Sequence, residues 1–171
     1  HIEMTRNVAS RFHSQLGDTF VLPQGKVQED TKLIPGTDGT KMSKSNNNSI
    51  NIFLDDKKLR KQVMGIQTDS TPMEEPKDPD TCNVFALYTI LGTSDAISAM
   101  RANYKGGNYG YGHAKQALFE LILERFSEER IRYSYYMKNL DEIDKALNIG
   151  STKASKVANA VLSRVRKQLG Y

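Results

Sequence analysis

Apolar side chains return every three to four residues over the first 16 positions of the chain. The positions that share one face are Thr5, Val8, Ala9, Phe12 and Leu16. This spacing predicts a helix, and Gly17 follows it as a stop. The short run Thr19–Leu22, which Pro23 ends, predicts a strand.

The helical period returns beyond residue 80 and dominates the second half of the chain. It predicts helices over about 80–91, 93–106 and 112–137, and a short one over about 140–147. A last helix begins at Ser151 or Thr152 and carries a continuous apolar stripe, made of Ala154, Val157, Ala158, Val161, Leu162, Val165 and Leu169. Helices that each carry one stripe are expected to bury it against each other, which predicts a helical bundle.

The middle of the chain carries little periodic pattern. Residues 24–48 are polar and rich in glycine and asparagine, which predicts a long loop, and such loops are usually functional. Apolar residues alternate briefly over 50–54, and Asp55-Asp56 then caps a helix. Residues 72–80 hold three prolines among acidic side chains, as a linker does. We expect a mostly α fold, with a mixed α/β part over 1–71 and a helical domain over 72–171.

Charge and cysteine content narrow the class of protein. The net charge is +4, but residues 1–100 hold 11 Lys/Arg against 13 Asp/Glu, whereas residues 101–171 hold 13 against 7. A basic helical half suits an anionic partner such as RNA, although a solvated helical surface explains it as well.

The single cysteine, Cys82, excludes an internal disulfide and fits a reducing, cytoplasmic compartment. No apolar run approaches the roughly 18 residues of a membrane span. Because the chain opens on His1 without a methionine, we treat it as part of a longer protein.

The most informative chemical pattern is a loop with the sequence Gly39-Thr40-Lys41-Met42-Ser43-Lys44-Ser45. Two lysines three positions apart, among small residues, could neutralise charge that builds on a leaving pyrophosphate. Serine hydroxyls and backbone N–H groups add donors. The segment is not a P-loop, which needs the pattern G-x-x-x-x-G-K-[ST]. On charge alone, an exposed polar loop without chemistry is the favoured explanation, as it is for most Lys/Ser/Asn-rich stretches.

The five residues from Lys41 to Ser45 are identical to the second signature of class I aminoacyl-tRNA synthetases. Other segments resemble the tryptophan and tyrosine members of that family, in the same order: His1–Arg6, Phe20–Pro23, Ile34–Thr40, Thr68–Ser70 and Tyr109–Lys115. The resemblance covers essentially the whole chain. It points to tryptophanyl-tRNA synthetases, with tyrosyl-tRNA synthetases as the nearest alternative.

This resemblance implies a Rossmann-type catalytic domain whose C-terminal end is residues 1–71, followed by an anticodon-binding-like helical domain. It implies a ligase that activates tryptophan with ATP and Mg²⁺ and charges tRNA(Trp), as a cytoplasmic homodimer. Lys41 and Lys44 would contact the ATP phosphates as the catalytic pair. Met42 and Ser43 would reach adenine and ribose through the backbone, and Ser45 would shape the loop. The family's first signature and tryptophan pocket are not among these residues, so we expect the chain alone to be inactive.

Candidate tRNA contacts are basic side chains of the predicted helices, namely Arg130, Arg132, Lys138, Arg164, Arg166 and Lys167. Tyrosines beside the first three could stack on bases. We expect no protein metal site, because His1, His13 and Cys82 lack ligand spacing. A non-catalytic tRNA-binding module and a protein scaffold without RNA remain alternatives. Salt-dependent tRNA binding would separate them.

Overall fold

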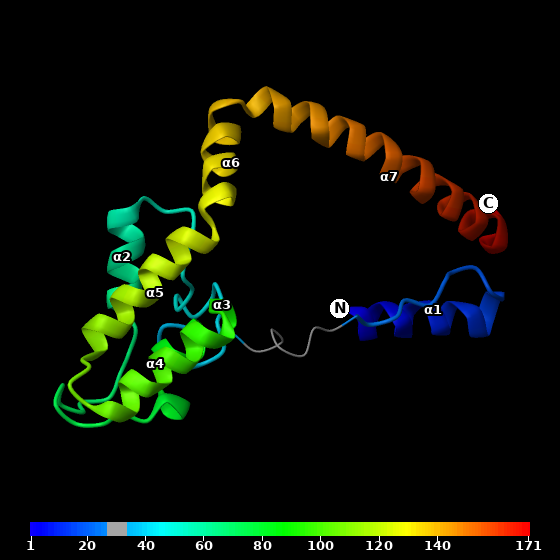
Figure 1. Cartoon of the computed structure of the whole chain (residues 1–171). Coiled ribbons are helices and arrows are strands. Elements are labelled where there is room, and N and C mark those ends of the chain that lie inside the picture. Colours follow the sequence, from blue (N-terminus) through cyan, green and yellow to red (C-terminus); the bar gives the residue numbers. More distant parts are fainter. Residues whose placement is uncertain (27–33) are drawn as a thin grey trace. The chain divides into compact units, whose positions relative to one another are not determined.

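The structure, a computed structural model, describes residues 1–26 and 34–171 (Figure 1). Within them the chain forms seven α-helices and no sheet, and strand-type pairing is limited to an isolated antiparallel bridge between Pro35 and Lys41. The expected mostly α fold is confirmed. The chain divides into two compact units, one made of His1–Val27 with Tyr135–Tyr171 and one of Gln28–Ser134. The proposed boundary between residues 71 and 72 stays a prediction, and residues 27–33 of the predicted loop lie outside the described residues.

The larger unit is a helical core built around α5. Its helices are α2 (Asp56–Met64), α3 (Asn83–Leu91), α4 (Ser94–Gly106) and α5 (Tyr111–Arg125), with a short 3-10 helix, Pro79–Thr81, before α3. α5 lies against both α2 and α3 (Figure 1). Side chains from all four helices make the core, among them Leu59, Val63, Val84, Phe85, Tyr104, Leu118 and Ile122. The Asp55 carboxylate caps α2 by accepting the Lys58 N–H at 2.9 Å, as the sequence predicted.

The acidic, proline-rich segment before α3 is folded around Lys77. This lysine is only 4% exposed. Its ammonium donates to the carbonyl oxygens of Pro72 at 2.6 Å, Glu75 at 3.0 Å and Met73 at 3.3 Å. Its backbone N–H donates to the Tyr104 carbonyl at 2.7 Å. The predicted linker is therefore a closed loop that packs on α4.

The smaller unit begins with α1 (Ile2–Leu16), which ends at Gly17 with φ +83°, as predicted. The predicted strand at Thr19–Leu22 was wrong. No neighbouring strand runs beside this segment in the described residues, and its backbone turns to α1 instead. The Phe20 N–H donates to His13 Nε2 at 2.9 Å, so its donor is used by a side chain rather than by a sheet.

One helix predicted over 112–137 is in fact two, α5 and α6 (Ser127–Lys138). They are separated at Phe126, whose backbone leaves helical geometry with φ −110° and ψ 19°. The Phe126 side chain packs against the apolar core of the larger unit. Tertiary burial of one ring thus interrupts a run that helical spacing alone would continue.

The two helices predicted over 140–147 and from Ser151 are one continuous helix, α7 (Leu140–Leu169). Thr152 does not cap a new helix, because its hydroxyl donates to the Asn148 carbonyl one turn back, at 2.9 Å. Within the smaller unit the apolar stripe is only partly covered, since Val157 is 67% and Leu162 42% exposed, and its burial against the other helices stays a prediction. Despite the length of α7, no described helix is both long and apolar enough to cross a membrane.

Candidate functional site

The signature loop begins as a tight reversal of the chain between Ile34 and Met42. The Met42 N–H donates to the Ile34 carbonyl at 2.9 Å, and the Gly36 N–H donates to the Thr40 carbonyl at 2.6 Å. Gly39 turns the chain with φ +80°, a conformation that a side chain disfavours. Two backbone hydrogen bonds therefore set the direction in which the chain enters the lysine-containing segment, residues 41–44.

Gly39 also rests directly on the first residue of α3. A Cβ atom at this position would lie 2.7 Å from Asn83 Oδ1, so the close approach requires glycine. Asn83 Nδ2 donates to the Gln67 carbonyl at 3.2 Å, and the Gln67 N–H donates to the Thr37 carbonyl at 2.7 Å. The base of the loop is thereby joined to the helical core.

Asp38 forms the polar centre of the reversal. Its Oδ1 accepts the Thr40 N–H at 3.0 Å, the Thr40 hydroxyl at 2.9 Å and Asn48 Nδ2 at 2.8 Å. The hydrogen bond from Asn48, followed by those from Thr40, lowers the pKa of the Asp38 carboxyl below its usual value. Neither Asp38 nor Asn48 was among the sequence candidates, because a polar residue in a polar run carries no distinguishing signal.

The two signature lysines point to solvent, whereas Met42, which lies between them in the sequence, turns toward the core. Lys41 and Lys44 are both exposed, and neither forms an ion pair with a described residue. Met42 is half-buried and lines an apolar hollow of about 160 Å³ against the core. The Ser43 and Ser45 hydroxyls lie 3.2 Å apart. The loop thus presents two ammonium groups on a short segment anchored by one apolar side chain.

Two further segments of the sequence resemblance meet next to the loop. The Tyr111 hydroxyl, in the Tyr109–Lys115 segment, donates to Asp69 Oδ1 at 2.7 Å, and burial raises the pKa of Tyr111. Lys115 donates to the Met64 carbonyl at the end of α2, at 3.1 Å, and burial lowers its pKa. These contacts fasten α5 to the chain that follows the signature loop, so both residues have a structural use.

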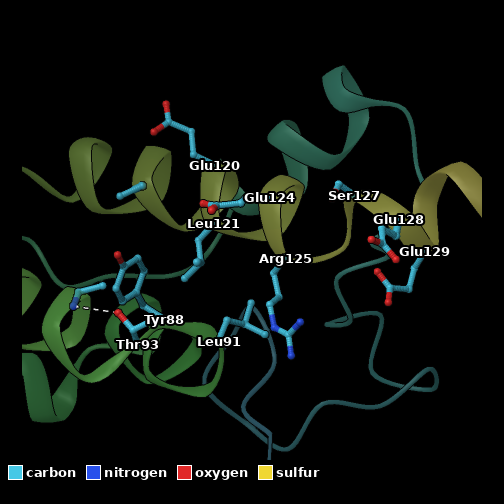
Figure 2. A pocket seen from close by; sticks show the side chains of 12 residues that line it. Tyr88, Leu91, Thr93, Glu120, Leu121, Glu124, Arg125, Ser127, Glu128 and Glu129 are labelled. Atoms are coloured by element: carbon cyan, nitrogen blue, oxygen red, sulfur yellow. Dashed lines mark hydrogen bonds between the residues drawn. The ribbon is translucent and has the colours of Figure 1, made fainter.

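A hollow of about 800 Å³ lies elsewhere in this unit, between α3 and the region where α5 meets α6 (Figure 2). Leu91 and Leu121 lie on facing helices there, and Arg125 is the one basic side chain among the described residues that line the hollow. Its carboxylates are Glu120, Glu124, Glu128 and Glu129. Because four carboxylates against one guanidinium repel phosphate, we do not assign a nucleotide to this hollow.

Of the predicted tRNA contacts, Arg130 is engaged inside the protein. Its side chain is 18% exposed and pairs with Asp56. It also donates to the Ile52 carbonyl, and to the Leu54 carbonyl at 3.0 Å. Its guanidinium therefore fixes the turn before α2, a role that the sequence pattern did not indicate.

The remaining predicted tRNA contacts are not brought together in one compact unit. Arg132 is exposed on α6 and lies 3.5 Å from the i−4 carboxylate of Glu128. Exposed positions at the end of α6 and on α7 hold the others, Lys138, Arg164, Arg166 and Lys167. Arg164 reaches the Thr19 carbonyl at 3.5 Å within the smaller unit. No group of three His, Cys, Asp or Glu side chains in the described residues could hold a metal ion.

Comparison with known proteins identifies the class of protein to which the signature loop and the helical core beneath it belong. The family model described as tRNA synthetases class I (W and Y) matches residues 1–127. The chain belongs to this family of class I tRNA synthetases.

Within the family, the similarities run to tryptophan–tRNA ligases. The chain is 43% identical over 171 residues to the enzyme of Fusobacterium nucleatum and 42% identical over 170 residues to that of Rhodopirellula baltica. These alignments cover 99% of this chain and 52% and 53% of the two relatives, so the chain spans about half their length. A crystal structure of Campylobacter jejuni tryptophanyl-tRNA synthetase complexed with ADP and tryptophan superposes with a TM-score of 0.86 at 36% identity, covering 100% of this chain and 54% of that one. The resemblance to the tryptophan enzymes is confirmed, and the tyrosine alternative is not favoured.

Proposed function

We propose that the chain supplies the ATP-side loop and tRNA-binding helices of a tryptophan–tRNA ligase. The observation that carries this proposal is the signature loop, in which Lys41 and Lys44 are exposed on a backbone fixed by the Ile34–Met42 reversal. Family membership and the tryptophan-specific relatives support the choice of amino acid. The proposed division of labour keeps residues 1–71 with the catalytic domain and 72–171 with the tRNA-binding domain.

The chemistry assigned to the loop is stabilisation of a leaving group. Attack of the tryptophan carboxylate on the α-phosphate of ATP forms tryptophanyl adenylate and releases pyrophosphate. Negative charge grows on the departing phosphates, so Lys41 and Lys44 ammonium groups placed there act mainly in the transition state. Mg²⁺ is proposed to accompany the phosphates as part of bound ATP.

The middle of the signature is proposed to contact adenine and ribose. The Met42 N–H already donates to the Ile34 carbonyl, and the Ser43 N–H donates to Asn48 Oδ1. Backbone contacts from this segment to the nucleoside would therefore come from carbonyl oxygens. Ser45 would shape the loop through its contact with the Ser43 hydroxyl.

The test of this function is the amino-acid dependence of ATP–pyrophosphate exchange by the full-length protein. We expect exchange that requires tryptophan and that tyrosine does not support. Exchange driven by tyrosine, or no exchange with either amino acid under conditions where a known tryptophan–tRNA ligase is active, would contradict the proposal.

We also propose that the protein acts as a cytoplasmic homodimer and binds tRNA(Trp) through exposed basic side chains. Arg164, Arg166 and Lys167 are the group that can be tested.

Replacing Arg164, Arg166 and Lys167 with alanine is expected to weaken tRNA binding. The slope of the log binding constant against log salt concentration is expected to become shallower by about one unit for each phosphate that the protein no longer neutralises. Filter binding at several salt concentrations measures this. The control is Lys145→Ala on the same helix, since Lys145 pairs with Asp141. An unchanged salt slope in the triple variant would exclude these residues as tRNA contacts.

A further inference from the structure

One asparagine of the signature loop differs from its neighbours in burial. Asn46, Asn47 and Asn48 follow the signature as a run of three. The first two are exposed, whereas Asn48 is only 2% exposed. A polar side chain buried in an otherwise exposed loop needs hydrogen-bond partners, and the identity of those partners indicates its use.

The Asn48 amide joins the reversal that precedes the signature to the first part of the signature, at Lys41 and Ser43. Its Nδ2 donates to Asp38 Oδ1 at 2.8 Å, to the Thr40 hydroxyl at 3.0 Å and to the Lys41 carbonyl at 3.1 Å. Its Oδ1 accepts the Ser43 N–H at 2.8 Å. Only a side chain that is both donor and acceptor can make this set, because an aspartate lacks the donors and a serine lacks the reach.

The space around this amide is closed. A Cβ atom added at Gly36 would lie 2.3 Å from both Cγ and Nδ2 of Asn48, so the amide rests on bare backbone. The Asn48 carbonyl also accepts the Thr37 N–H at 2.8 Å. The amide is therefore held in one place by the reversal that precedes the signature.

We propose that Asn48 is a positioning residue for the signature lysines. It fixes the Lys41 carbonyl and the Ser43 N–H on either side of Met42, while the Lys41 and Lys44 side chains stay exposed. The segment then loses less conformational entropy when its ammonium groups bind the phosphates. This smaller cost favours both ATP binding and the transition state. This inference rests on the proposed function of the loop.

The experiment compares Asn48→Ala and Asn48→Asp with Asn46→Ala in the full-length protein. The control removes a neighbouring asparagine whose exposed side chain lies outside the hydrogen-bonded set. Both Asn48 variants are expected to lower kcat/KM for ATP in pyrophosphate exchange about tenfold, as the loss of buried hydrogen bonds implies, and to leave KM for tryptophan unchanged. Amide hydrogen exchange over residues 40–44 is expected to quicken in Asn48→Ala and to stay unchanged in Asn46→Ala.

Several outcomes would overturn the inference. One is an Asn48→Ala protein that matches Asn46→Ala in kcat/KM for ATP. Another is an equal loss for ATP and tryptophan together with a lower melting temperature, since that pattern belongs to general unfolding. The Lys44→Ala variant separates this inference from the proposed function. If Lys44→Ala is impaired while Asn48→Ala is not, only the positioning role fails; if Lys44→Ala is fully active, the proposed function fails, and hydrogen exchange still reports on the Asn48 contacts.

Discussion

In the full-length protein, Lys44→Ala is expected to lower the rate of tryptophan-dependent ATP–pyrophosphate exchange about 100-fold to 1,000-fold, the range seen when one donor to developing charge is removed. Lys44 is exposed and forms no ion pair with the described residues, so its removal breaks no packing within them. The loss should therefore fall on kcat, with a smaller change in KM for ATP. Steady-state exchange kinetics with ATP and tryptophan varied separately measure both.

The matched control for this prediction is Lys57→Ala, which removes another exposed lysine from the same compact unit. It is expected to retain full exchange activity. Equal rates for Lys44→Ala and Lys57→Ala would show that the ammonium group at 44 does not stabilise the departing pyrophosphate.

Lys77→Met is expected to lower the free energy of unfolding by about 3 kcal/mol, because it removes a buried ammonium that donates to three carbonyl oxygens. Methionine keeps most of the aliphatic stem, so the change reports on the hydrogen bonds rather than on a change in side-chain volume. The loop that Lys77 closes is then expected to open first. Urea denaturation followed by circular dichroism measures the free energy.

Lys105→Met serves as the control for Lys77, since Lys105 is an exposed lysine on the adjacent α4. Its effect is expected to stay within about 0.5 kcal/mol. A Lys77→Met protein as stable as the Lys105→Met protein would mean that water satisfies the three carbonyl groups equally well once the ammonium is gone.

Helix ends were predictable where a local signal sets them. Asp55 caps α2 and Gly17 ends α1 because capping chemistry depends on the residue itself. The break at Phe126 was not predictable, because burial of its ring against distant helices decides it. The continuity of α7 through Gly150 was missed because glycine weakens a helix without stopping it.

The candidate site shows the same contrast between features that a local sequence signal marks and features that the folded chain decides. The signature lysines could be singled out from the sequence because their type and spacing are specific, and their catalytic role stays a prediction. Asn48 was not, since its hydrogen bonds depend on a reversal that brings Asp38 and Thr40 beside it. The charge of Arg130 suggested RNA, but its partners lie 74 to 78 positions earlier in the chain and could not be predicted from the local pattern. Its contact with tRNA stays a prediction.

The burial of Cys82 has a practical consequence for observing the loop in solution. It is the one cysteine of the sequence, it is 7% exposed, and its sulfur lies 3.4 Å from the Tyr104 hydroxyl. A thiol so enclosed reacts slowly with maleimide reagents. Within this chain, a cysteine introduced at the exposed Asn46 would therefore take up a fluorophore in preference to Cys82, and its emission would report on the surroundings of the signature loop as nucleotide is added.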